Sequence, residues 1–218
     1  MINNILSHTQ VAFLREVGAS NLAGGFYLTG GTSLAAFYLK HRYSEDLDFF
    51  SEQEFDAISI DVFLKSVRRK LGFTAIDFQQ SYNRNLFFCH LKNGVLKTEF
   101  TYFPFSRIER GKYEYGITID SLLDIAVNKL FAIYQRTRAR DYVDLFFIIK
   151  EYNFSILELA RKARAKFDWH IDPLQLGTQF VKVMKVKDYP RMIKPLDEKE
   201  LVEFFIKESK ALTPKIME

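Results

Sequence analysis

The chain has 218 residues, of which 48% are hydrophobic and 16% aromatic, so it can bury a sizeable core and is not intrinsically disordered. Lys and Arg outnumber Asp and Glu by 31 to 27, and residues 124–166 account for the whole net charge of +4 because they contain nine basic and five acidic residues. Cys89 is the single cysteine and no apolar run reaches the roughly 18 residues of a membrane span, which excludes disulfide frameworks, cysteine zinc sites and transmembrane helices. Without a signal-peptide pattern at the N-terminus, we expect a cytoplasmic protein with no membrane partner.

The first part of the chain alternates helices and strands. A capping box of Ser7 and Gln10 predicts a helix that ends at Gly18, and Phe26–Leu28 predicts a strand that runs into a glycine turn. The elements expected next are a helix at 34–39, a strand at 46–50, a helix at 56–71 ending at Gly72, and two strands at 85–91 and 95–103 joined by the hairpin dipeptide Asn93-Gly94.

From Asp120 onward the pattern is helical. Ser155 with Glu158 and Asp197 with Glu200 predict capping boxes, and Asp172-Pro173 predicts an N-cap followed by the first helical residue. We therefore expect an α+β fold, with a mixed sheet and flanking helices in residues 1–119. A helical lobe in residues 120–218 should follow and complete a cleft.

Asp46 and Asp48 are the first candidate site residues. Residues two apart on a strand point to the same face, so both carboxylates should project side by side, with Leu47 and Phe49 facing the core. Such a pair suits one or two divalent cations with oxygen ligands. The alternative is an exposed strand end with solvated acids.

The turn Gly30-Gly31-Thr32-Ser33 lies between a strand and a helix, where backbone N–H groups and the helix dipole favour an anion. Glycine would let a phosphate approach, and Thr32 or Ser33 could add a hydroxyl donor. The alternative is a turn that only reverses the chain. The spacing matches neither a P-loop nor a dinucleotide-binding fingerprint.

A third acid, Glu99, alternates with Lys97 and Thr101 along the next strand. Glu99 could meet Asp46 and Asp48 if the two strands are neighbours. An ordinary solvent-facing row of Lys and Glu is the alternative.

Lys129 stands on an otherwise apolar helix face, where a lysine either extends to the surface or reaches into a site. On the next helix, Arg140 is placed to pair with Asp144 at four residues. Arg136, Arg138 and Arg140 would contact a triphosphate or an RNA backbone, or lie on a solvated helix end.

These motifs together resemble the AbiEii/AbiGii-type nucleotidyltransferase toxins of the DNA polymerase β-like nucleotidyltransferase superfamily. The resemblance covers roughly residues 26–150. The residues that support it are Gly30-Gly31-Thr32-Ser33, His41-Arg42, Ser44, Asp46-Leu47-Asp48-Phe49-Phe50, Asp124, Asn128-Lys129, Arg136, Arg140-Asp141 and Asp144. The third acid is commonly Asp in the superfamily, whereas it is Glu99 here.

The resemblance implies a nucleotidyltransferase-like sheet and a metal-dependent enzyme that transfers NMP from an NTP to RNA, in particular tRNA. It also implies a toxin role with a separate antitoxin protein. The metal, Mg²⁺ or Mn²⁺, would be held by Asp46, Asp48 and Glu99. Lys129 and Asp141 would complete the catalytic set, and the nucleotide would be bound by Gly30, Gly31, Thr32, Ser33, Lys129, Arg136, Arg140 and Asp144.

Two other functions stay open at this point. One is a nucleotide-sugar glycosyltransferase with a D-x-D motif, and the other is a non-catalytic nucleotide- or RNA-binding module of the same fold. The sequence leaves the preferred NTP, the acceptor, the oligomeric state and the role of residues 151–218 undetermined.

Overall fold

The computed structural model describes residues 5–212, and the chain divides into two compact units. The first unit comprises residues up to Tyr38 and Ser44–Ser121, and the second comprises Leu39–Tyr43 and the residues from Leu122 onward. The boundary expected after residue 119 did not anticipate that the short segment Leu39–Tyr43 would belong with the helices.

A mixed seven-stranded sheet forms the centre of the first unit, in the order β3-β4-β5-β2-β1-β7-β6. The central strand β2 pairs antiparallel with β1 and parallel with β5, and β1 pairs parallel with β7. The strands are β1 (Tyr27–Thr29), β2 (Leu47–Ser51), β3 (Ala75–Ser81), β4 (Arg84–Leu91), β5 (Gly94–Tyr102), β6 (Lys112–Glu114) and β7 (Ile117–Ile119). The mixed sheet with flanking helices confirms the predicted α+β class.

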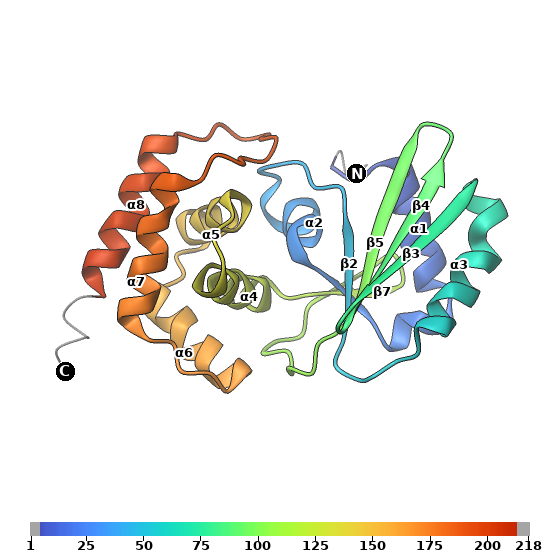
Figure 1. Ribbon diagram of the computed structural model, residues 1–218, viewed down its shortest axis with the longest axis horizontal. Coiled ribbons are helices and arrows are strands. Elements are labelled where there is room, and N and C mark those ends of the chain that lie inside the picture. The colour runs from blue at the N-terminus through green and yellow to red at the C-terminus, as the bar shows by residue number, and fades with distance from the viewer. Residues whose placement is uncertain (1–4, 213–218) are drawn as a thin grey trace. The chain divides into compact units, whose positions relative to one another are not determined.

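Helices α1 (His8–Gly18) and α3 (Ala57–Leu71) cover one face of this sheet (Figure 1). Phe13 of α1 packs against Phe49 of β2 and Phe63 of α3, with ring centroids 6.1 and 6.0 Å apart. This buried face contains the apolar half of each alternating strand. The other side chains of β2, including Asp48, therefore point to the opposite face of the sheet.

Local sequence signals account for several boundaries in this unit. The Ser7–Gln10 capping box forms at the start of α1, and Asp56 accepts a hydrogen bond from the backbone N–H of Ile58 at the start of α3. Gly72 ends α3 in the left-handed conformation, with φ of +74°. The β4–β5 hairpin also forms around Asn93-Gly94, so these predictions are confirmed.

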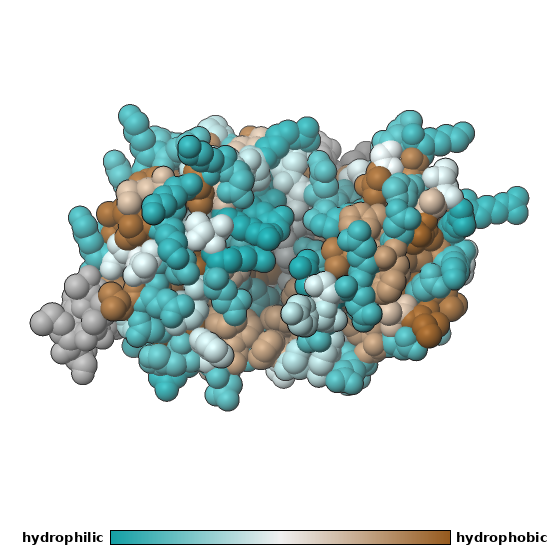
Figure 2. Space-filling model, in the orientation of Figure 1, coloured by the Kyte–Doolittle hydropathy of each residue, from teal (hydrophilic) through white to brown (hydrophobic). Residues whose placement is uncertain are grey.

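The surface over α3 includes exposed hydrophobic side chains, among them Ile58 and Val62 with exposed fractions of 66% and 60%. Figure 2 shows hydrophobic residues at the surface over this helix, within an otherwise largely hydrophilic face. Isolated exposed apolar residues of this kind are ordinary for a protein surface. No helix within residues 5–212 is long and apolar enough to cross a membrane.

The second unit is helical. Its elements are α4 (Leu122–Gln135), α5 (Ala139–Tyr152), α6 (Ile156–Phe167), α7 (Pro173–Val181), the 3₁₀ turn η3 (Lys182–Lys185) and α8 (Glu198–Ala211). Asp172 and Asp197 accept N-cap hydrogen bonds from backbone N–H groups, which confirms both N-caps. The Glu200 carboxylate accepts from Lys150, so the capping box predicted for Asp197 and Glu200 forms only in its N-cap half. Ser155 occupies the N-cap of α6, but its hydroxyl accepts no cap hydrogen bond, so the predicted capping box is wrong there. Residue spacing marks the helix start and does not fix the serine rotamer.

The segment Leu39–Tyr43 packs against the chain before α8. Three short elements precede it, namely the 3₁₀ turn η1 (Asn21–Gly24), α2 (Gly30–Leu34) and the π-helical turn η2 (Ala35–Leu39). Arg42 forms an isolated β-bridge with Met192, and the backbone N–H of Ile193 donates to the carbonyl of His41 at 2.8 Å. These contacts place His41 and Arg42 inside the helical unit, where both are buried.

Candidate functional site

The sheet brings the three predicted acids to one face. Asp48 lies opposite Glu99 on the parallel neighbour β5 and opposite Thr29 on β1. Asp46 precedes β2 by one residue and has the same alternation phase as Asp48. Asp46 and Asp48 both raise the pKa of the nearby Arg84, after its hydrogen bonds to Glu99, as expected for acids gathered around one basic group.

Basic side chains partner two of these acids. Lys97 Nζ donates to Asp46 Oδ2 at 2.8 Å, and both side chains remain about one-third exposed. Arg84 donates through Nε and Nη2 to the two carboxylate oxygens of Glu99, at 2.7 and 2.5 Å. Burial alone would raise the pKa of Glu99, but the hydrogen bonds from Arg84 and Thr101 outweigh burial and lower it. Glu99 is therefore a buried, ionised carboxylate.

Asp46 and Asp48 offer a donor set that fits a divalent cation. Carboxylate oxygens are the hard ligands that Mg²⁺ prefers, and Mg²⁺ often binds through one or two carboxylates together with substrate phosphates. The ammonium group of Lys97, which binds the Asp46 carboxylate, indicates that this position favours a positive charge. Within residues 5–212, no three His, Cys, Asp or Glu side chains are arranged to hold a metal ion. The expected role of Glu99 as a third ligand stays a prediction.

The glycine turn lies directly beside Asp48. Gly30 begins α2 with φ of +76°, and a Cβ at this position would collide with the Asp48 carboxylate. Thr32 is fully buried, and its hydroxyl contacts the Ser44 hydroxyl and donates to the carbonyl oxygen of Asp46. Ser33 is also fully buried. The turn thus fixes Asp46 and Asp48, and its half-exposed part is the backbone of Gly30 and Gly31.

Lys129 reaches into a polar cluster of the helical unit and does not extend to solvent. Its side chain is 11% exposed, and Nζ lies 2.8 Å from Asp141 Oδ1 and 2.6 Å from Asp144 Oδ2, both on α5. Arg136 Nε contacts the other oxygen of Asp141 at 3.3 Å. Burial alone would raise the pKa of Asp141, but the charge and hydrogen bond of Lys129 outweigh burial and lower it.

Asp144 is the centre of this cluster. Arg42 donates to both of its carboxylate oxygens, with Nε–Oδ1 and Nη2–Oδ2 distances of 2.6 and 2.8 Å, and His41 Nε2 lies 2.8 Å from Oδ1. Burial would raise the pKa of Asp144, but Arg42 and Lys129 hold it well below its usual range. Burial is also the main reason why the pKa of His41 is lowered.

The predicted ion pair between Arg140 and Asp144 is wrong. Asp144 points into the helical unit, whereas Arg140 is exposed, and no ion pair joins them in the part of the chain that the structure describes. Helix spacing alone could not reveal that Asp144 already has three basic partners. The sequence pattern assigns His41 and Arg42 no role of their own, and only the tertiary fold shows that they bind Asp144.

Solved structures with a related fold come from Helicobacter pylori. JHP933 aligns with 96% of this chain and 90% of its own, at a TM-score of 0.60 and 22% identity. A second H. pylori protein, described as a nucleotidyltransferase, aligns with 100% of this chain and 98% of its own, at a TM-score of 0.63 and 22% identity. The chain thus has a nucleotidyltransferase fold.

The chain belongs to the nucleotidyl transferase AbiEii toxin family of type IV toxin–antitoxin systems, whose model matches residues 12–213. A relative from Aquifex aeolicus strain VF5, the uncharacterised protein aq_aa25, is 31% identical over 165 residues. That alignment covers 74% of this chain and 76% of the relative. The family resemblance found in residues 26–150 is confirmed, and the match continues through the C-terminal helices.

Proposed function

We propose that the protein is a metal-dependent nucleotidyltransferase toxin that transfers NMP from an NTP to RNA, in particular to tRNA, in the cytoplasm. The observation that carries this proposal is the pair Asp46 and Asp48 beside the glycine turn, within a chain of the AbiEii family. Two carboxylates next to an accessible glycine backbone match the needs of a triphosphate bound with a cation.

In this proposal Asp46 and Asp48 hold Mg²⁺ or Mn²⁺. When bound, the cation would offset the negative charge that develops on the oxygens of the transferred phosphoryl group. The backbone N–H groups of Gly30 and Gly31 bind triphosphate oxygens. Glu99, kept ionised by Arg84, takes up the proton of the acceptor hydroxyl directly or through a water that it orders. The hydroxyl oxygen bonds to the α-phosphorus, the bond between the α- and β-phosphates breaks, and pyrophosphate leaves.

In this proposal, basic side chains of the helical unit bind the phosphates of the nucleotide. We propose that Lys129 contacts the triphosphate and that Asp141 and Asp144 set the position of its ammonium group. Arg136 remains half-exposed and can contact a phosphate, as can the exposed Arg140. Because the Asp144 carboxylate is fully buried and bound by three basic side chains, its part in nucleotide binding is indirect.

A non-catalytic binding module is the second candidate. It is favoured by the ion pairs that Lys97 and Arg84 form with Asp46 and Glu99, since protein cations already neutralise these acids. The glycosyltransferase alternative has no comparable support, because the chain belongs to a nucleotidyltransferase family.

Incubation of the purified protein with Mg²⁺ or Mn²⁺, each α-³²P-labelled NTP and total tRNA tests the proposal. We expect label in the RNA with at least one NTP, and a loss of about 100-fold or more in Asp48→Asn and Lys129→Ala. Lys65→Ala, an exposed lysine of α3, is the control and should label RNA at the wild-type rate.

Expression in cells provides the second readout. The wild type should inhibit growth, and Asp48→Asn should not. If no NTP labels the RNA and the wild type does not inhibit growth, the transferase-toxin proposal is wrong and the binding module becomes the better description.

A further inference from the structure

The face of the sheet that displays the acids continues beyond them as a row of aromatic rings. Phe50 lies two residues after Asp48 on β2, and its neighbours in register are Thr101 on β5 and Tyr27 on β1. Ring centroids are 6.2 Å apart for Tyr27–Phe50, 4.7 Å for Phe50–Phe103 and 4.9 Å for Phe103–Phe105.

This aromatic row differs from the core on the other face. Phe49 and Phe100, on the covered face, are completely buried, whereas Phe50, Phe103 and Phe105 are half-buried. Partly exposed aromatic rings on a sheet are platforms on which nucleobases can stack. The row crosses the sheet at Phe50, two residues along β2 from Asp48, so a single-stranded nucleic acid bound on the rings would pass beside the acids.

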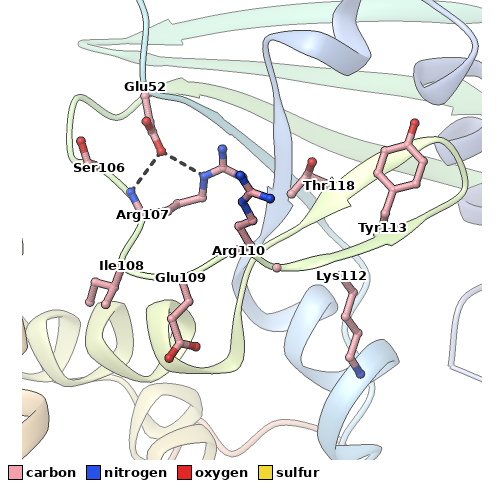
Figure 3. A pocket seen from close by; sticks show the side chains of 10 residues that line it. Glu52, Ser106, Arg107, Ile108, Glu109, Arg110, Lys112, Tyr113 and Thr118 are labelled. Atoms are coloured by element: carbon pink, nitrogen blue, oxygen red, sulfur yellow. Dashed lines mark hydrogen bonds and ion pairs between the residues drawn. The ribbon is translucent and has the colours of Figure 1, made fainter.

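A pocket of about 500 Å³ lies at the Tyr27 end of the row, because Thr118 in its lining is the register partner of Tyr27. Its lining includes Glu52, Thr118, Arg107 and Arg110. Glu52 comes directly after β2, four residues beyond Asp48, a separation of at most about 13 Å along the chain. Figure 3 shows the guanidinium groups of Arg107 and Arg110 pointing toward one another, while Lys112 points away.

The two arginines differ in how they are held. Glu52 accepts hydrogen bonds from the backbone N–H and Nε of Arg107, at 3.1 and 3.0 Å, and the guanidinium stacks on the Tyr27 ring at 4.5 Å. Arg110 is exposed and has no hydrogen bond or ion pair recorded with any residue in 5–212. Two like charges facing one pocket repel unless an anion lies between them. Glu52 binds Arg107, and the carboxylate of Glu109, the second acid of the lining, points away from the two guanidinium groups (Figure 3). The pocket therefore suits a phosphate group.

We propose that this face binds the single-stranded end of the RNA acceptor, with bases stacked on Phe50 and Phe103 and a backbone phosphate held by Arg107 and Arg110. The proposal rests on the proposed function, since the acids must lie next to the reacting hydroxyl of the bound RNA. The phosphates of one NTP are directly linked to one another, so a triphosphate held at the acids would not also place a phosphate in a pocket about 13 Å away. A duplex would hide the base faces that the rings require.

Fluorescence anisotropy with a 5′-fluorescein-labelled single-stranded oligoribonucleotide, without metal or NTP, tests this inference. Arg110→Ala should weaken binding about 3- to 10-fold and reduce the slope of log K against log salt by about one. Phe50→Leu, which keeps an apolar side chain, should weaken binding at least 5-fold with little change in salt slope. Arg69→Ala is the matched control, because Arg69 is an exposed arginine of α3, the helix that covers the opposite face.

Several outcomes would overturn the inference. These are wild-type affinity in both Arg110→Ala and Phe50→Leu, equally tight binding of a duplex of the same length, or a raised KM for NTP in Arg110→Ala with an unchanged KM for RNA. The last result would assign the pocket to the nucleotide. RNA binding without transfer by the wild type would contradict the proposed function alone, and transfer unaffected by Arg110→Ala would contradict this inference alone.

Discussion

At the scale of single residues, Gly30 couples backbone conformation to the position of a candidate metal ligand. Gly30 and Gly72 have nearly the same φ, +76° and +74°, but only a Cβ at Gly30 would meet other atoms, those of Asp48. Both Gly30→Ala and Gly72→Ala should lose about 1 kcal/mol of unfolding free energy because alanine disfavours the left-handed region. Only Gly30→Ala should also lose transferase activity. Urea unfolding and the RNA-labelling assay check this prediction, which equal activity in the two variants would contradict.

Asp144 offers a second contrast, between a buried and an exposed ion pair. Asp144→Asn removes a negative charge that balances the buried Arg42 and Lys129, and should cost about 3–5 kcal/mol. Glu200→Gln removes a carboxylate whose partner is Lys150, in a pair that is about half exposed, and should cost less than about 1 kcal/mol. Urea unfolding of both variants measures the difference. Similar losses would mean that the Asp144 cluster contributes little to stability.

At the scale of elements, two helix starts with similar sequences differ in structure. Asp197 accepts hydrogen bonds from the backbone N–H groups of Lys199 and Glu200, whereas the Ser155 hydroxyl accepts none at the start of α6. Asp197→Ala should therefore cost about 1 kcal/mol, and Ser155→Ala only a few tenths. Thermal unfolding followed by circular dichroism would detect the difference. An equal loss in the two variants would indicate that Ser155 caps α6 in solution.

Elements with strong local signals could be predicted from the sequence. Asn93-Gly94 predicted the hairpin, and Gly72 predicted the end of α3, because each requires a backbone conformation that few residues adopt. β3 was missed because nearly all of its residues are exposed, so it has no apolar alternation to detect. Edge strands of this kind are stabilised by pairing with a neighbour, here β4.

The sequence predicted which acids of the candidate site share a face, but not which basic residues bind them. Alternation along a strand was sufficient to place Asp46 and Asp48 on one face. The partnership of Arg84 with Glu99, and of Arg42 with Asp144, joins residues 15 and 102 positions apart. Such pairs depend on strand register and tertiary packing, which a single sequence does not specify.

At the scale of the whole molecule, buried ionisable groups predict how stability depends on pH. The folded-state pKa values of Asp144, Asp141 and Glu99 are lowered, so their stabilisation is present above an unfolded pKa of about 4 and is lost as pH falls below it. The folded-state pKa of His41 is also lowered, so below about pH 6.5 the unfolded chain binds a proton that the folded chain does not. Stability should therefore begin to fall near pH 6.5 and fall more steeply near pH 4.

The unfolding free energy measured from pH 8 to pH 4 checks this expectation. His41→Asn should flatten the curve between pH 7 and pH 5, whatever its effect on absolute stability. His8→Asn, the same substitution at an exposed position, is the matched control. A wild-type curve that is flat from pH 7 to pH 5 would contradict the assignment of His41 as buried and neutral.

Because Leu39–Tyr43 belongs to the helical unit, the gene cannot be divided into the two units by one cut. The chain passes from one unit to the other three times, after Tyr38, Tyr43 and Ser121. A fragment that begins at Leu122 contains Asp144 but lacks His41 and Arg42, so the buried carboxylate of Asp144 would lose two of its partners. No single breakpoint separates the two units, because a cut after Ser121 leaves Leu39–Tyr43 with the first unit. Recombination that exchanges the helical unit among relatives must therefore also transfer a five-residue piece encoded far upstream.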